Sequence, residues 1–199
     1  MTSTLDADHV LAPARPASPA GISASLRDGG TTVLRPLGDG EITPQLAVLE
    51  GLSDLSRQQR FLVPVAARLP AAMQAALGAI DGDRHVAWLA SVDGRPAGVA
   101  RSVELEPGAA EVALEVVDLH QGRGVGTLLL EAVTTVAAAR GVRRLSATVL
   151  PGNIASVRLL AHVGLRFREA GGVLEATARL RLPCPALLDM ADVLSAAGV

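Results

Sequence analysis

The chain has 199 residues, of which 49% are hydrophobic, and this is enough for one domain with a full core. Its net charge of −2 gives no electrostatic reason to expect a nucleic acid or an anionic membrane as a partner. The N-terminus lacks the charged and apolar regions of a signal peptide, and no apolar run approaches the roughly 20 residues of a membrane span. A single cysteine, Cys184, cannot form an internal disulfide, so the expected compartment is the reducing cytoplasm. All 18 basic residues are arginine, and tyrosine is absent.

Three regions are expected along the chain. Residues 1–29 are rich in Ala, Pro, Ser and Gly without periodicity, which is typical of a disordered arm. Residues 30–182 carry regular patterns and are expected to form the domain. The tail at 183–199 is expected to hold at most one short helix. No internal repeat is present.

Apolar spacing and turn residues predict the secondary structure of the domain in chain order. The predicted elements are a strand at 31–37, helices at 42–55, from 56 and at 69–80, strands at 84–92, 96–106 and 111–118, a helix at 126–140, a strand at 143–150, a helix from 153 to 164, and strands at 165–170 and 173–182. This order predicts an α/β (α+β) fold, in which helices flank a mixed, mostly antiparallel sheet with one parallel step.

The most informative segment lies between the strand at 111–118 and the following helix. Gly122, Gly124 and Gly126 fall within five positions there. Bare backbone N–H groups at a helix N-terminus attract anions, because the helix dipole adds about half a positive charge. One glycine normally suffices for a turn, so three indicate that a ligand approaches the backbone closely. A tight strand-to-helix turn without a ligand remains the alternative.

Two familiar phosphate-binding motifs do not fit this segment. A P-loop needs a lysine after its glycines, and the chain has none. A dinucleotide site needs the spacing G-x-G-x-x-G, but here Thr127 stands where the third glycine belongs. That site also needs an acidic residue at the end of the next strand, and the strand at 143–150 ends without one.

A third motif does fit. The run from Gln121 to Gly126 is similar to the Q/R-x-x-G-x-G/A signature of the GNAT superfamily of acetyl-CoA-dependent N-acetyltransferases. Asn153, Leu159 and the run 164–167 resemble the N-x-x-x-x-x-L…G-F stretch of the same family. The segments LSRQQRF and IDGDRHVAWLASVDGRPAGVAR also resemble the acetyltransferase domains of bacterial protein-lysine acetyltransferases. The resemblance covers residues 31–181 and implies a single GNAT-like domain of bacterial type.

The resemblance also implies how acetyl-CoA would bind. Its pyrophosphate would lie on the amides of 121–127, with the Thr127 hydroxyl on a phosphate, and its pantetheine arm would pair with the strand at 115–119. Asn153 fits both a contact with that arm and a plain helix cap. The residues expected to bind the cofactor are Val116, Val117, Asp118, Leu119, Gln121, Gly122, Arg123, Gly124, Val125, Gly126, Thr127, Asn153 and Ser156.

Acetyl transfer to an amine needs a base, because a free alkyl amine has a pKa of about 10.4. By strand parity, Glu111 and Glu115 share one face of the strand at 111–118, opposite the face expected to join the core. The resemblance favours Glu111 as the base, with Glu115 as second choice. A solvated sheet face is the alternative for both. Backbone N–H groups near residues 116 and 117 are candidates to stabilise the oxyanion.

We therefore expect an enzyme that transfers an acetyl group from acetyl-CoA to a primary amine by direct attack in a ternary complex. The acceptor is a protein lysine or a small molecule, and no metal, nucleic acid or membrane is expected to take part. Many family members protonate the departing thiolate with a tyrosine, whereas Leu160 occupies that position here. That departure leaves a non-catalytic acyl-CoA-binding regulatory module as the alternative. A homodimer stays open.

Overall fold

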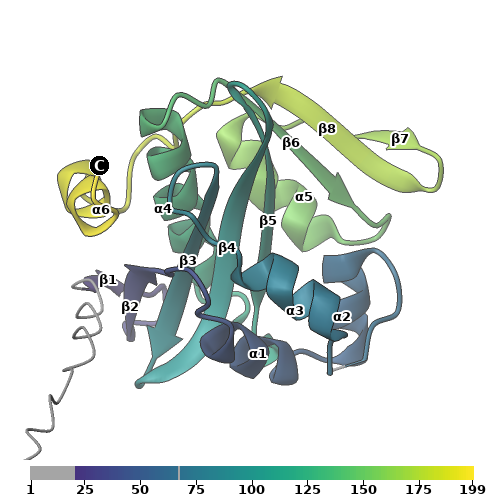
Figure 1. The fold of residues 1–199 in the computed structure, drawn as a ribbon, viewed down its shortest axis with the longest axis horizontal. Helices are drawn as coiled ribbons and strands as arrows, with labels where there is room; N and C mark the ends of the chain where they lie inside the picture. The colour runs from purple at the N-terminus through teal and green to yellow at the C-terminus, as the bar shows by residue number, and fades with distance from the viewer. Residues whose placement is uncertain (1–20, 67) are drawn as a thin grey trace, which may run out of the picture.

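The computed structural model describes residues 21–66 and 68–199, and the first 20 residues of the expected arm lie outside this part. Eight strands in the described residues form one open sheet in the order β1-β2-β3-β4-β5-β6-β8-β7 (Figure 1). The strands are β1 (Ile22–Ser25), β2 (Thr31–Pro36), β3 (His85–Val92), β4 (Arg95–Glu106), β5 (Ala109–Val116), β6 (Arg144–Val149), β7 (Arg168–Ala170) and β8 (Val173–Arg179). The helices are α1 (Thr43–Glu50), α2 (Asp54–Phe61), α3 (Ala71–Gly78), α4 (Val125–Ala139), α5 (Ile154–Leu160) and α6 (Met190–Ala196), with 3-10 turns η1 (Asp118–His120) and η2 (Ala161–Val163).

The sheet is antiparallel except between β5 and β6, as the order of elements predicts. These two parallel strands pair only at their beginnings, from Ala109 opposite Arg144 to Glu111 opposite Ser146. Beyond that point they diverge (Figure 1). The divergence leaves one edge of β5 without a strand partner in the middle of the sheet.

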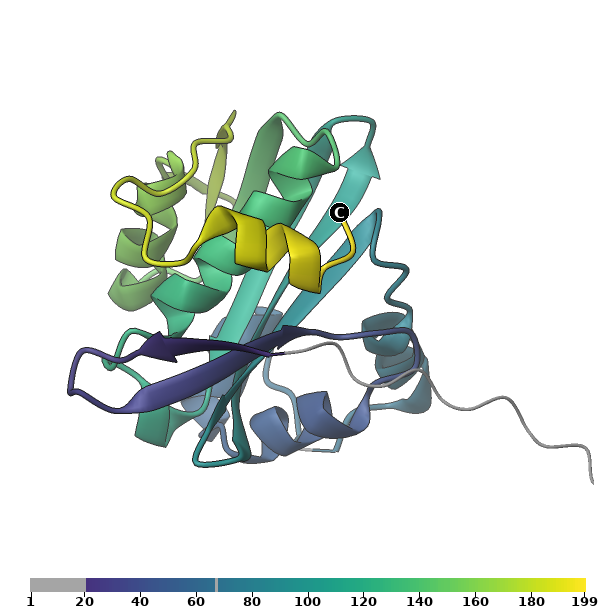
Figure 2. The same ribbon diagram turned by 90° about the vertical axis from the view of Figure 1, so that its left-hand side faces the viewer.

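Helices cover both faces of the sheet. On one face, α4 contacts β3, β4 and β5, and α6 lies across α4 near β1 (Figure 2). On the other face, α1 contacts β4 and β5, and α2 contacts β5. Within the described residues, no helix is both long and apolar enough to cross a membrane.

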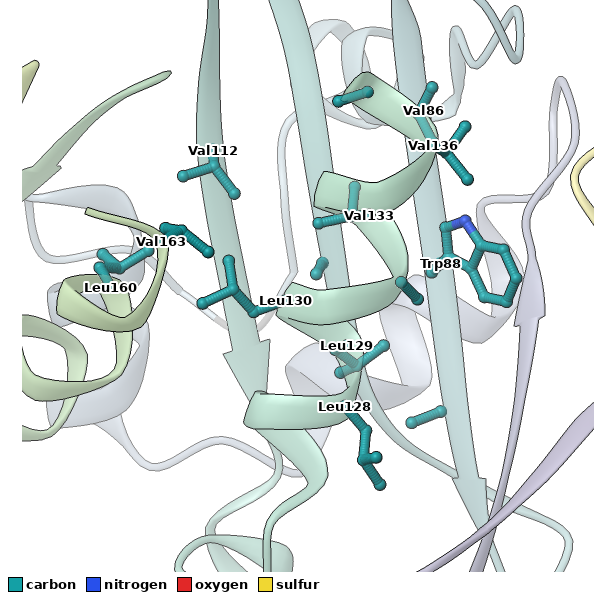
Figure 3. Packing of buried hydrophobic residues seen from close by; sticks show 14 of the residues in the cluster. Val86, Trp88, Val112, Leu128, Leu129, Leu130, Val133, Val136, Leu160 and Val163 are labelled. Atoms are coloured by element: carbon teal, nitrogen blue, oxygen red, sulfur yellow. The ribbon is translucent and has the colours of Figure 1, made fainter. Parts of the chain in front are cut away.

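The main core lies between α4 and the sheet (Figure 3). The stripe Leu128, Leu129 and Val133 of α4 packs in one cluster with Trp88 of β3 and Val112 of β5, and all five side chains are buried. Burying a side chain of this size contributes about 1.5–3 kcal/mol. The stripe therefore fixes the first turn of α4, and the glycine segment before it, against the end of β5.

Most predicted elements are present within a few residues of their expected bounds, but the helix expected at 42–55 ends early, since α1 stops at Glu50. We expected a helix to begin at Ser56, whereas α2 begins at Asp54, and Ser53 caps it by accepting a hydrogen bond from the Ser56 N–H at 3.2 Å. The helical conformation ends at the C-cap Gly51, directly after α1. Ser53 has the extended backbone that an N-cap needs.

The boundary of the expected N-terminal arm also needs correction. Strand β1 lies inside the segment 1–29, which was expected to be disordered. It pairs with β2 from Ile22 opposite Leu34 to Ser25 opposite Thr31, and Ile22 packs against the main core. The strand is too short to show a periodic pattern, and its order comes from this pairing.

The C-terminal tail contains the expected short helix, α6, and joins the core. Val193 of α6 is completely buried. Just before the helix, the backbone N–H groups of Leu187 and Leu188 each donate a hydrogen bond of 2.8 Å to the buried carboxylate of Glu131 on α4. Burial of an acidic side chain is thereby compensated by two main-chain donors.

Candidate active site

The glycine segment presents a row of free amides. Among the described residues, none of the five consecutive backbone N–H groups from Gly122 to Gly126 finds a hydrogen-bond acceptor. The next two N–H groups, those of Thr127 and Leu128, donate to the Gly124 carbonyl at 3.0 and 3.2 Å and begin α4. Unpaired N–H groups at the start of a helix, here one of 15 residues, are the arrangement that attracts anions in proteins.

Each of the three glycines also has a local structural reason. Gly122 and Gly124 have φ values of 74° and 102°, which side chains rarely adopt. A Cβ on Gly126 would lie 3.1 Å from the Leu159 side chain of α5, so this glycine lets the two helices approach. The hydroxyl of Thr127, which was expected to contact a phosphate, has no hydrogen-bond partner among the described residues.

The unpaired edge of β5 continues from this segment. Val117 donates its N–H to Ala97 of β4 at 2.9 Å, and its carbonyl accepts the N–H of His120 at 2.8 Å. Since successive residues of a strand point their backbone groups to opposite sides, Leu114 and Val116 direct theirs toward β6, where pairing has ended. Both backbone groups of Val117 are therefore used within the protein. The N–H of Val116 is the better placed of the two candidate oxyanion donors.

Gln121 and Asp118 link this edge to α2. The Gln121 side-chain amide donates to the Val116 carbonyl at 3.1 Å, to Asp118 at 3.2 Å and to the Ser56 hydroxyl at 3.4 Å. Burial would raise the pKa of Asp118, but hydrogen bonds led by that from Ser53 outweigh it and hold the pKa below its ordinary value. Leu119 is 80% exposed beside them.

A pocket of about 190 Å³ opens where β5 and β6 diverge. Its walls come from α2, β5, β6 and α5, and they combine a few polar groups with apolar side chains. The lining residues are Gln59, Arg60, Phe61, Leu62, Glu111, Val112, Ala113, Leu114, Thr148, Val149, Asn153, Ser156 and Leu160. The pocket thus brings the expected base Glu111 together with the expected cofactor residues Asn153 and Ser156.

The two glutamates of β5 lie on one face, as parity predicts, but in different surroundings. Glu111 lines the pocket, and its carboxylate has no ion pair or hydrogen bond with any described residue. Glu115 is ion-paired with Arg60 of α2 and lies 3.5 Å from Arg101 of β4. Glu115 is therefore already engaged by two cations.

The partners of Glu115 extend beneath α1. Arg101 is buried, and its guanidinium donates to the Gln45 side chain of α1 at 2.8 Å and to the Leu77 carbonyl at 3.4 Å. Burial lowers the pKa of Arg101, and the nearby carboxylate of Glu115 opposes this effect. The network joins α1 and α2 to the central strands.

Asn153 serves as the cap of α5, as one of its two interpretations predicts. Its side-chain oxygen accepts the Ser156 N–H at 3.1 Å. Because the cap uses only the oxygen, the Asn153 amide NH₂ is left for a ligand in the pocket.

A second hollow, of about 280 Å³, lies between α3 and the residues just before α1, and it is larger than the pocket beside Glu111. The only ionisable side chain in its lining is Asp39. Only the smaller of these two hollows lies on the unpaired edge of β5 and contains Glu111. No group of three or more His, Cys, Asp or Glu side chains in the described part could hold a metal ion.

Comparison with known proteins shows the family and the fold of the chain. The model of the acetyltransferase (GNAT) family matches residues 51–165. The GNAT domain of S. lividans protein acetyltransferase (PAT) is 32% identical, with a TM-score of 0.73 over 80% of this chain and 97% of that one. The chain therefore belongs to the GNAT acetyltransferase family, and its fold is the single GNAT-like domain expected from the sequence.

Two further structures share the fold at lower identity. A cAMP-binding acyltransferase from Mycobacterium smegmatis is 23% identical, with a TM-score of 0.61, and the match covers 91% of this chain and 57% of that one. The Salmonella typhimurium protein yncA, solved with its cofactor acetyl-CoA, is 16% identical, with a TM-score of 0.57 over 78% of this chain and 99% of that one.

Sequence reasoning did not find the arginines of this site. Arg60 and Arg101 meet Glu115 although 55 and 14 residues separate them from it. No local spacing signals such a contact. The run Asp28-Gly29-Gly30, by contrast, is a turn signal that could have revealed the hairpin of β1 and β2.

Proposed function

We propose that the protein is an acetyl-CoA-dependent N-acetyltransferase in which Glu111 is the general base for a primary amine. The five free amides at Gly122–Gly126 fit a diphosphate, and the unpaired edge at Leu114–Val116 fits the amides of a pantetheine arm. When bound, acetyl-CoA supplies the acetyl thioester. The residues of the chain position it, receive the amine and accept the proton.

The observation that carries this proposal is the contrast between the two carboxylates. Glu111 faces the pocket without a partner among the described residues, whereas Glu115 is held by Arg60 and Arg101. A base must be free to take a proton from the ammonium group, directly or through water. The Glu115 carboxylate is already held by the guanidinium groups of Arg60 and Arg101, so its oxygens are not free to receive the amine.

The Val116 N–H is proposed to stabilise the negative charge that develops on the acetyl oxygen. It lies two residues from the free amide and carbonyl of Leu114, on the edge of β5 that faces β6. No tyrosine is available to protonate the departing thiolate. Leu160 lines the pocket instead, so water must supply that proton or the thiolate must leave unprotonated.

A protein lysine is the acceptor that we favour, since the chain is 32% identical to the GNAT domain of a protein acetyltransferase. A small primary amine is the other acceptor within the same chemistry. The absent tyrosine favours one further candidate, a module that binds an acyl-CoA without turnover. No membrane or nucleic acid enters either proposal.

The test measures thiol release from acetyl-CoA with lysine peptides and a panel of small amines, alongside calorimetry of CoA binding. Glu111→Gln should lower kcat by about 10²–10⁴-fold and leave the Kd for CoA unchanged. Glu169→Gln on β7, an exposed glutamate at the far edge of the sheet, is the matched control. Tight CoA binding without release for any acceptor would favour the module, and full activity of Glu111→Gln would remove Glu111 as the base.

A further inference from the structure

The turn between β1 and β2 lies directly on the glycine segment. The backbone N–H of Arg27 donates to the Arg123 carbonyl at 3.0 Å. Figure 2 shows this hairpin passing beside the first turn of α4. The contact joins residues almost a hundred positions apart, so it is a tertiary feature of the site.

The Arg27 side chain runs over the middle of the free amides. A Cβ placed on Gly124 would lie 3.4 Å from Cγ of Arg27 and 3.7 Å from its Nε. The aliphatic part of the Arg27 side chain therefore packs against Gly124. Its Nε, the first atom of the guanidinium, lies beside the middle of the free N–H groups from Gly122 to Gly126.

Two arginines lie at this place, and only one is neutralised. Arg123 forms an ion pair of 2.5 Å with Asp28 and donates to Nδ1 of His120 at 2.9 Å. The hydrogen bond from Arg123 holds the pKa of Asp28 below its ordinary value, so this carboxylate stays charged. The exposed guanidinium of Arg27 has no acceptor among the described residues. The turn thus brings one uncompensated positive charge to the amides.

From this geometry we infer that Arg27 is a binding residue for the diphosphate of the acyl donor, which its guanidinium contacts beside Gly124. The inference rests on the proposed function, because it concerns the same donor. A diphosphate carries at least two negative charges, and five neutral amides do not balance them. A guanidinium supplies charge-assisted hydrogen bonds in a planar fork that matches phosphate oxygens.

The experiment measures CoA binding by calorimetry for the whole protein and three variants. Arg27→Gln keeps the stem that packs on Gly124 and removes the charge, and the backbone hydrogen bond to Arg123 is unaffected. It should raise the Kd for CoA about tenfold and reduce its dependence on salt. Arg27→Lys, which keeps the charge but lacks the planar fork, should bind CoA more tightly than Arg27→Gln and more weakly than the wild type. Arg168→Ala, an exposed arginine on β7, is the control that should bind as wild type.

Truncated donors identify which phosphate is contacted. With dephospho-CoA, which lacks the 3′-phosphate, the tenfold effect of Arg27→Gln should persist. In acetyl transfer, S-acetylpantetheine, which has no diphosphate, should show the same KM with both proteins. A thermal unfolding midpoint of Arg27→Gln equal to that of the wild type is the control that shows the variant to be folded.

Equal CoA affinities for wild type and Arg27→Gln would overturn the inference while leaving the proposed function intact. An effect that vanishes with dephospho-CoA would assign Arg27 to the 3′-phosphate and overturn its assignment to the diphosphate. If the wild-type protein fails to bind CoA at all, the proposed function itself fails.

Discussion

Arg101 of β4 lies 3.5 Å from Glu115 of β5, with side chains only 5% and 9% exposed. The same carboxylate is ion-paired with Arg60, a residue of α2 that lines the pocket. Glu115 is therefore a positioning residue for α2. Its replacement should lower the stability of the fold more directly than it affects the reaction.

Glu115→Ala should lower the free energy of unfolding by about 3–5 kcal/mol, because it leaves the Arg101 cation buried without its anion. Glu111→Gln should change that free energy by less than about 1 kcal/mol, since no described residue pairs with Glu111. Urea unfolding of both variants at pH 7 provides the measurement. Equal effects would mean that the two carboxylates do not play the separate roles inferred for them.

Gly124→Ala should destabilise the loop. The φ of 102° at this position costs a residue with a side chain about 1–3 kcal/mol. We expect a matching fall in the free energy of unfolding and a weaker affinity for CoA. Gly38→Ala is the control, because a Cβ there would make only an ordinary contact of 3.7 Å with Glu41. If Gly124→Ala were as stable as the wild type, a side chain at this φ would not be costly, and the argument for glycine here would be wrong.

His85 should make stability depend on pH. Its Nδ1 donates to the Ala79 carbonyl at 2.6 Å, and its buried Nε2 has no partner among the described residues. Burial lowers the pKa of His85 below 6.5, the Ala79 bond opposes this, and the charge of Arg101 adds to the lowering. The folded protein therefore binds this proton less well than the unfolded chain.

The consequence is a contribution to stability that is complete above pH 6.5 and is lost as the pH falls toward the lower pKa of the folded state. His85→Asn keeps a donor for Ala79 and cannot be protonated in this range. The difference in unfolding free energy between wild type and His85→Asn should shift in favour of the variant on acidification from pH 7.5 to 5.5. A difference independent of pH would show that His85 titrates alike in both states.

Glu131→Ala should release the C-terminal segment. The Leu187 and Leu188 N–H groups would lose their acceptor, at a cost of about 1–3 kcal/mol for each donor left unsatisfied. Hydrogen exchange should accelerate over residues 187–199 more than over the sheet. Glu131→Gln, which retains an acceptor oxygen, should show a smaller change. Unaltered exchange in the segment would mean that α6 is held by its apolar contacts alone.

Several features could be predicted from the sequence because their signals are local. The order of elements from β2 onward follows from apolar spacing and from turns such as Asp93-Gly94, where both residues have positive φ. The glycine segment is evident because its three glycines fall within five positions. Parity on β5 correctly placed Glu111 and Glu115 on one face. Short-range sterics and strand alternation suffice for each of these inferences.

The tertiary structure alone decided what surrounds those residues. Only in the tertiary structure does β1 pair with β2, and only there does Glu115 form ion pairs with Arg60 and Arg101. The same folding leaves Glu111 unpaired in the pocket and packs the Arg27 side chain on Gly124. The physical reason is that charge pairing and burial depend on distance in space. Chain folding brings residues together across dozens of positions, and no local pattern records which cation will reach which carboxylate.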